Sequence, residues 1–230
     1  MTTNISDIRS AVKKVAWGFF LIYININMGT LDILPDWAGY ALMVSALGVI
    51  AMEEESAKLI KPFGTILVVW NLIEWILKIF GLQIYLNYVS IIPSAINLYF
   101  TFQLFTNLAA IADKYSCPQA KRLLVLRTIN VIFTVSNTFL LYLGIITEGG
   151  EIYTVFMMGI LVVALIIMLA ILITLFSFAS SLGEIEEQML QAAPQAPQDM
   201  PAPDFPLYQP AQTDTPSQKP ADETDIPPQE

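Results

Sequence analysis

Long apolar runs joined by short polar connections constrain this chain more than any other feature. A membrane-spanning helix needs about 20 mostly apolar residues at a rise of ~1.5 Å each. Six segments of the sequence approach that length. They are residues 11–28, 37–52, 62–80, 88–111, 123–146 and 152–182. The pattern predicts an all-α fold, a polytopic integral membrane bundle of six transmembrane helices in contact with the lipid bilayer.

The composition agrees with a membrane protein and confines the net charge to one region. The chain is 55% hydrophobic and only 13% charged, against about a quarter charged residues in an ordinary soluble domain. Residues 1–182 hold ten basic and ten acidic residues, whereas residues 183–230 hold one Lys and ten acidic residues. The formal charge of −9 therefore belongs to the C-terminal segment.

The distribution of basic residues predicts the sidedness of the bundle. Connections 29–36, 81–87 and 147–151 contain no Lys or Arg, and only Lys78 lies near that side. The opposite ends of the runs carry Arg9, Lys13, Lys14, Lys58, Lys61, Lys114, Lys121 and Arg122. We therefore expect a multi-pass protein of the cell (plasma) membrane. The positive-inside rule places both of its termini in the cytoplasm. No A-x-A-like cleavage site follows the first run, so we expect that run to be retained as a helix.

The C-terminal segment divides into two parts. Residues 183–192, "GEIEEQMLQA", have the pattern of a short amphipathic helical extension. Residues 193–230 are rich in Pro, Gln and acidic residues and too poor in apolar residues to offset the entropy of ordering. We expect a disordered cytoplasmic tail, which is either a solvated segment or a docking segment for a cytoplasmic partner.

The segment "NMGTLDILPDWAGY" (27–40) joins the first two predicted helices, and little chain is available for two membrane crossings and a connection between them. The 38 residues from Val15 to Met52, if fully helical, span ~57 Å, against ~60 Å for two crossings of a ~30 Å hydrocarbon core. The arithmetic predicts a tight turn at the outer membrane boundary. Gly29 is suited to ending the first helix and Asp36 to capping the second. Gly39 suits a close helix approach, whereas Asp32 has no evident capping role.

Polar residues from separate segments are expected in the same outer leaflet. Because ionisable groups within a span are costly, they are candidate functional residues. The predicted outer polar pocket consists of Asn25, Asn27, Asp32, Asp36, Asn71, Glu74 and Lys78. The alternative is that Glu74 and Lys78, four residues apart, neutralise each other within one helix.

A second polar stripe lies on the predicted fifth helix. Its members, at helical spacing, are Arg127, Asn130, Thr134 and Asn137. Gln103 and Asn107 are expected at a similar depth on the fourth helix, which favours helix–helix packing over a solute path. Pro93 is expected to kink that fourth helix near its outer end.

The absence of certain residue types limits the chemistry. The sequence has no His and a single cysteine, Cys117, which excludes intramolecular disulfides, thiolate zinc sites, His-ligated haem and His-based triads. No cofactor, metal site, nucleic-acid partner or enzymatic activity is expected. Cys117 lies in a short basic loop and is either an ordinary loop cysteine or a reactive or acylated thiol.

Residues 23–43, "YININMGTLDILPDWAGYALM", resemble a stretch of small uncharacterised polytopic membrane proteins of Gram-positive bacteria. The shared L-P-D-x-x-G-Y element after the first span is formed here by Leu34, Pro35, Asp36, Gly39 and Tyr40. The resemblance implies bacterial membrane localisation and no particular activity. We expect a structural or regulatory membrane component with a docking tail, or alternatively a small transporter or channel-like protein that uses the outer pocket and the polar stripe.

Overall fold

The computed structural model of the protein describes residues 4–24, 27–28, 31–32, 35–81, 91–142 and 151–192. The chain divides into two compact units, residues 1–193 and 194–230. All described residues belong to the first unit. The expectations for residues 193–230 therefore fall outside the described residues.

The described part of the chain is all-helical apart from one very short strand pair, as the sequence predicts. The elements are α1 (Ile5–Tyr23), β1 (Asn27–Met28), β2 (Leu31–Asp32), α2 (Asp36–Glu53), α3 (Ala57–Ile79), α4 (Ile91–Lys114), α5 (Gln119–Tyr142) and α6 (Glu151–Ala192). β1 and β2 pair antiparallel, with Asn27 opposite Asp32 and Met28 opposite Leu31.

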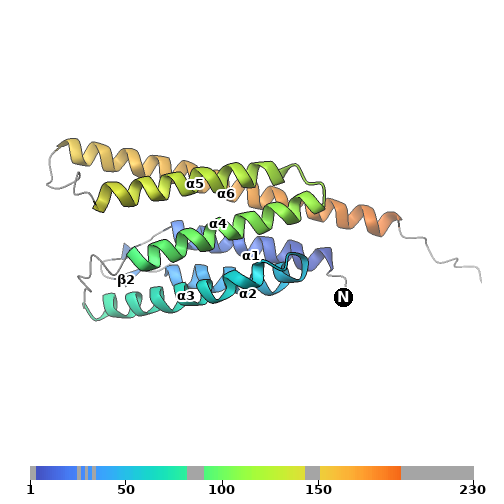
Figure 1. Ribbon diagram of the computed structural model, residues 1–230, viewed down its shortest axis with the longest axis horizontal. Coiled ribbons are helices and arrows are strands. Elements are labelled where there is room, and N and C mark those ends of the chain that lie inside the picture. The colour runs from blue at the N-terminus through green and yellow to red at the C-terminus, as the bar shows by residue number, and fades with distance from the viewer. Residues whose placement is uncertain are drawn as a thin grey trace, which may run out of the picture. The chain divides into compact units, whose positions relative to one another are not determined.

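Helices that follow each other in the sequence pack together, and the last helix returns to the first (Figure 1). α1 packs against α2 and α6, α3 against α2 and α4, and α5 against α4 and α6. The backbone of β2 lies against α3. The bundle has two ends. We call the one where α1, α3 and α5 begin the basic end, and the other, where α4 begins and the strands lie, the hairpin end.

Four helices in the described part of the chain are long and apolar enough to cross a membrane. They are Ala57–Ile79, Ile91–Lys114, Gln119–Leu140 and Val155–Ala192. This finding is consistent with a membrane protein. α1 and α2 are shorter, with 19 and 18 residues, and α1 carries Arg9, Lys13 and Lys14.

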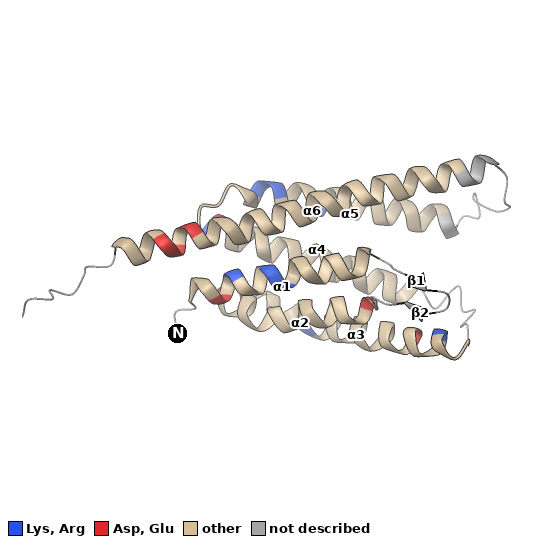
Figure 2. Cartoon of the chain, turned by 180° about the vertical axis from the view of Figure 1, so that it is seen from behind, with Lys and Arg blue, Asp and Glu red and all other residues tan. Residues whose placement is uncertain are grey.

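α1 and α2 stop well before the hairpin end that α3, α5 and α6 reach (Figure 2). Tyr23, the last residue of α1, donates a 3.2 Å hydrogen bond to Asn130, the twelfth of the 24 residues of α5. Tyr40, near the start of α2, meets Phe100 of α4 at a ring-centroid distance of 6.3 Å. The connection between α1 and α2 therefore begins about halfway along the bundle, earlier than the predicted end of the first helix at residue 28. That the turn lies at the outer membrane boundary stays a prediction.

The register of α1 explains this difference. The helix begins at Ile5, not Ala11, because Asn4 caps it by accepting from the Ser6 N–H at 3.4 Å and because Ile5 and Ile8 are buried in the core. It ends at Tyr23, so the predicted role of Gly29 in ending it is wrong. Ile24 has an extended backbone instead, and a β-branched residue tolerates that conformation well.

Two prolines occupy other positions in their helices than the sequence predicts. α3 begins five residues before Pro62 and includes it. The Ala57 and Ile60 side chains of this added turn are completely buried, which offsets the one backbone hydrogen bond that proline cannot make. Pro93 lies in the first turn of α4, where its missing N–H would be unpaired in any helix, so no interior kink is expected there.

α2 begins at Asp36, one residue before the predicted start of the second helix at residue 37. Pro35, with φ −69° and ψ 134°, occupies the N-cap, and Asp36 is the first helical residue. The Asp36 carboxylate then favours the helix through the positive end of its dipole. The close approach predicted for Gly39 is confirmed: a Cβ there would lie 2.6 Å from the carbonyl oxygen of Gly18 on α1.

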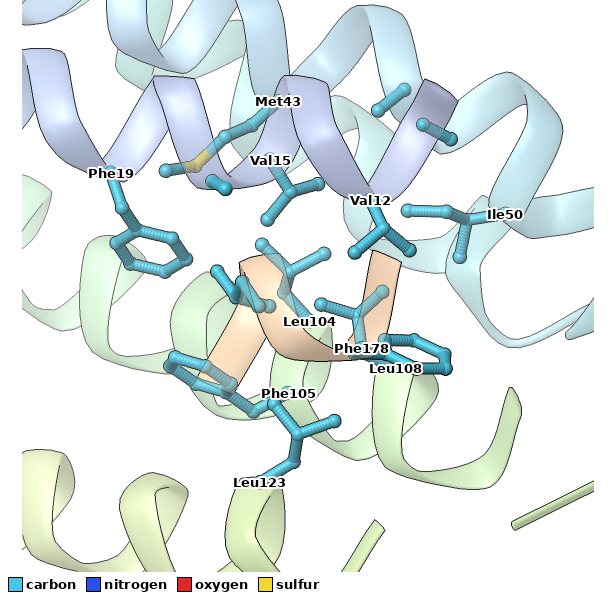
Figure 3. Close-up of a cluster of buried hydrophobic side chains, with 14 of the residues drawn as sticks. Val12, Val15, Phe19, Met43, Ile50, Leu104, Phe105, Leu108, Leu123 and Phe178 are labelled. Atoms are coloured by element: carbon cyan, nitrogen blue, oxygen red, sulfur yellow. The ribbon is translucent and has the colours of Figure 1, made fainter. Parts of the chain in front are cut away.

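The core lies in the half of the bundle nearer the basic end. α1, α2, α4 and α6 direct large apolar side chains toward one another there (Figure 3). Phe19 and Phe105 stack with ring centroids 5.3 Å apart. Phe178 of α6 is completely buried in the same cluster. This half is held by burial of apolar surface, which stabilises by about 25 cal/mol per Å².

Candidate polar pocket

A polar pocket opens in the other half of the bundle, beside the start of α2. Its volume is about 230 Å³. The lining residues are Tyr40, Leu67, Trp70, Asn71, Glu74, Pro93, Ser94 and Asn97. Because α2 is shorter than α3 and α4, its start leaves their facing surfaces partly uncovered. The pocket forms in this space, and three helices supply its walls.

Glu74 is the carboxylate of this pocket, and its partner is aromatic. Glu74 Oε1 accepts a 2.8 Å hydrogen bond from Trp70 Nε1, one turn earlier on α3. The ion pairs within 4.0 Å in the described part of the chain do not include one between Glu74 and Lys78. The alternative of a self-neutralising intrahelical pair is therefore wrong here. Lys78 is exposed near the end of α3.

Asn97 is the residue of the opposite wall that sequence reasoning missed. Its Oδ1 accepts from the Tyr40 hydroxyl at 3.0 Å and from the Thr101 hydroxyl at 3.3 Å. Ser94, Asn97 and Thr101 recur at spacings of three and four on α4, which places them on one helical face. That spacing was available in the sequence and could have identified this polar face of α4.

The structure brings together only part of the predicted pocket. Asn71 and Glu74 line it, and Lys78 does not. Asn25 and the side chains of Asn27 and Asp32 lie outside the described residues. The backbones of Asn27 and Asp32 pair with each other in the β1–β2 ladder, and β2 lies against α3, the helix of Glu74. Asp36 begins α2, four residues before Tyr40.

The polar stripe of α5 does not converge on one site. Arg127 Nη1 donates to the Thr106 hydroxyl at 3.0 Å, and its guanidinium lies 4.5 Å from the centroid of the Phe102 ring on α4. Asn130 is buried and bonded to Tyr23 of α1. These two residues therefore connect α5 to two different helices, as the packing interpretation expects.

The remaining two stripe residues line separate, largely apolar grooves at the hairpin end. Thr134 belongs to a groove of about 290 Å³ between α4 and α5. Asn137 belongs to one of about 550 Å³ between α5 and α6, with Phe133, Gly159 and Val163. Neither groove has an ionisable residue in its lining.

Polar contacts at the basic end join helix termini. Lys114, at the end of α4, forms an ion pair with Glu53, at the end of α2. The Ser56 hydroxyl lies 2.7 Å from Asn107 Oδ1, which also accepts from Gln103 at 3.4 Å. Gln103 and Asn107 thus take part in packing near this end. Cys117, in the α4–α5 connection, is buried, and burial raises the pKa of its thiol above the ordinary value.

α6 is held by polar contacts at the basic end. Gln119 Nε2 donates to the Ser177 hydroxyl at 2.9 Å and lies 3.0 Å from that of Ser181. Arg9 of α1 approaches Glu186 at 3.8 Å. A Cβ on Gly183 would lie 2.8 Å from the Arg9 guanidinium carbon. The last turns of α6 therefore leave the bundle from a fixed position.

Comparison with protein-family models, with curated proteins and with solved structures returned no match. The class of the protein consequently rests on its own geometry. It is an all-helical chain with several helices suited to a membrane, a solid core at the basic end and a polar pocket toward the other end.

Proposed function

We propose that the chain is a non-enzymatic structural or regulatory protein of the cell membrane, whose helical body anchors a cytoplasmic docking tail. The observation that carries this proposal is the fixed exit of α6. Contacts of Gln119 and Arg9 hold the helix against α5 and α1, and it continues without a break to Ala192. A tail that starts from a defined position is favoured as an attachment point for a partner.

The proposed sidedness puts both termini in the cytoplasm. It is supported by the gathering of Lys and Arg toward the basic end (Figure 2) and by the positive-inside rule. Six crossings and four crossings with a re-entrant α1–α2 hairpin share this sidedness. The bond of Tyr23 to the midpoint of α5 favours the re-entrant arrangement, since non-helical backbone at membrane depth is tolerated where protein or a water-filled cavity surrounds it.

Sidedness and depth are tested separately. In a Cys117→Ser background, Phe80→Cys should react with an impermeant maleimide on intact cells, and Arg122→Cys only after permeabilisation. For depth, a variant with Trp37 as its single tryptophan is reconstituted with brominated lipids. Stronger quenching by deep than by shallow bromines supports the re-entrant hairpin, whereas the reverse order supports six crossings.

The docking function is tested by complementation of a deletion strain. A chain ending at Ala192 should keep the thermal midpoint of the full chain and lose complementation. The matched control is a full-length chain with Glu187→Gln, which changes one acidic residue before the tail and should complement. Full complementation by the truncated chain contradicts the docking function.

A small transporter or channel-like protein is the second candidate, favoured by the pocket of Glu74, Asn71 and Asn97. This function requires a path through the other half of the bundle, where Phe100, Leu104 and Leu108 are completely buried. A transporter would therefore have to repack that core in each cycle. Loss of complementation by Glu74→Gln, with a dispensable tail, would favour this candidate over docking.

A further inference from the structure

The pocket between α2, α3 and α4 has one wall of hydrogen-bond acceptors. Glu74 uses Oε1 for the bond from Trp70, and within the described residues no donor reaches its Oε2. Asn71 Nδ2 donates to the Leu67 carbonyl oxygen at 2.8 Å, which leaves Asn71 Oδ1 as an acceptor. The two residues are three apart on α3, so they face the same side. This wall carries a negative charge and a neutral oxygen.

The opposite wall presents a donor. Because Asn97 Oδ1 already accepts from Tyr40 and Thr101, the side-chain orientation is set by those bonds, and the amide NH₂ group has no acceptor among the described residues. Tyr40 and Trp70 also line the pocket and contribute aromatic side chains to it. A ligand that satisfies both walls needs donors with positive charge on one side and an acceptor on the other.

The volume and the charge of the pocket further limit the kinds of ligand that it can bind. About 230 Å³ is small beside the ~300–1,000 Å³ of sites for drug-sized molecules. A hard divalent cation requires several oxygen ligands, usually with more than one carboxylate. Glu74 is the single carboxylate in the lining, and no group of three metal-ligating side chains occurs in the described part of the chain. A small ammonium group needs one carboxylate, neutral acceptors and aromatic faces.

We propose that this pocket binds a primary amine that carries a nearby acceptor oxygen, of the ethanolamine type. The ammonium group donates to Glu74 and Asn71, and the oxygen accepts from the Asn97 amide. The same chemistry occurs in a free solute and in the ethanolamine headgroup of a membrane lipid. The inference concerns the pocket that the second candidate function would use, but it requires neither transport nor the tail.

The test uses the full-length protein in nanodiscs of phosphatidylglycerol, which has no amine. Ethanolamine should raise the thermal midpoint in a saturable manner, and ethylene glycol, of similar size without the charge, should not. Glu74→Gln should weaken ethanolamine binding about tenfold or more, since a charge-assisted bond is lost. Glu187→Gln, an exposed acid-to-amide change on α6, is the matched control and should leave binding unchanged.

The source of the amine is distinguished by a second nanodisc. With phosphatidylethanolamine present, a raised midpoint that free ethanolamine no longer shifts assigns the headgroup. An additional shift by free ethanolamine assigns the solute. Asn71→Ala tests the same wall if Glu74→Gln does not fold. The proposal is overturned if no amine shifts the midpoint in either nanodisc, or if both variants bind ethanolamine as the wild type does. Transport and complementation assays are separate readouts, so their failure is distinguishable from failure of binding.

Discussion

The Tyr23 hydroxyl at the end of α1 donates to the amide oxygen of Asn130 at the middle of α5, at 3.2 Å. This bond marks how far α1 extends along the bundle. Everything that follows α1, including the β1–β2 pair and the start of α2, is arranged from that depth. It also explains why the polar pocket lies where α3 and α4 continue beyond α2.

Removing the hydroxyl should destabilise the bundle. In Tyr23→Phe the buried Asn130 oxygen loses its partner, and an unsatisfied buried polar group costs about 1–3 kcal/mol. We expect a lower thermal midpoint in detergent, measured by circular dichroism. Tyr99→Phe is the control, because Tyr99 is 43% exposed and packs through its ring on Phe63. Equal midpoints for the two variants would contradict the role of the bond.

The α1–α2 crossing depends on two facing glycines. A Cβ on Gly18 would lie 2.7 Å from the Gly39 carbonyl oxygen, and one on Gly39 would lie 2.6 Å from that of Gly18. Either Gly→Ala change should cost about 1–3 kcal/mol through overpacking. Gly48→Ala, on the same α2 helix with no atom within 4 Å of the added Cβ, should be neutral or stabilising by up to about 1 kcal/mol. A loss of stability in Gly48→Ala as large as in Gly39→Ala would refute the close approach.

The sequence predicted the helical class because each apolar run is long and its connections are short. It also predicted the close approach at Gly39. Asn71 and Glu74, two members of the predicted outer pocket, line the pocket between α2, α3 and α4. It misplaced the end of α1 because "ININ" continues the apolar pattern in composition, while the backbone leaves the helix at Ile24. The depth of α1 is set by contacts such as Phe19–Phe105, which join residues far apart in sequence and leave no local signal.

Asn97 shows the same limit of prediction from sequence at the polar pocket. Its spacing from Ser94 and Thr101 was visible in the sequence, but its neighbour Tyr40 lies 57 positions away. The contact between α2 and α4, which are separated in sequence by α3, depends on the tertiary arrangement. The periodicity of a single helix therefore identifies a polar face, and only the packing shows which polar faces meet.

Cys117 should react slowly with alkylating reagents in the folded protein. It is 5% exposed, and burial raises the pKa of its thiol. Since the thiolate is the nucleophile, the rate should rise with pH at a higher midpoint than in the chain unfolded by SDS. Iodoacetamide labelling followed by mass spectrometry over a pH series measures this difference. Equal rates in the folded and unfolded chains would favour the reactive thiol considered from the sequence.

The α4–α5 turn contains a residue whose replacement by glycine should stabilise the protein. Ser116 has φ 55°, and the Cys117 N–H bonds to the Ala112 carbonyl oxygen at 2.8 Å, the helix-ending arrangement that favours glycine. Ser116→Gly should stabilise by roughly 0.5–1 kcal/mol. Gly81, with φ 69° after α3, supplies the reverse case, and Gly81→Ala should lose about 1 kcal/mol. Thermal midpoints that move in the same direction for both variants would contradict this account.

The attachment of α6 to α5 should appear as energetic coupling between Gln119 and Ser181. Gln119 is 4% exposed and lies within hydrogen-bond distance of Ser181 and Ser177 on α6. Gln119→Ala should cost about 1–2 kcal/mol, because a buried hydrogen bond is lost. Ser181→Ala should cost less, since Ser177 still accepts.

The double variant should lose less than the sum of the two single losses, because each change removes the same contact. Thermal midpoints of the four chains complete the cycle. Thr65→Ala, which removes an exposed hydroxyl bonded within α3 to the Lys61 carbonyl oxygen at 3.0 Å, replaces Ser181→Ala in a control cycle and should show additivity. Additive losses for Gln119 and Ser181 would mean that these residues do not hold α6 in place. The defined exit of the tail would then lose its structural basis.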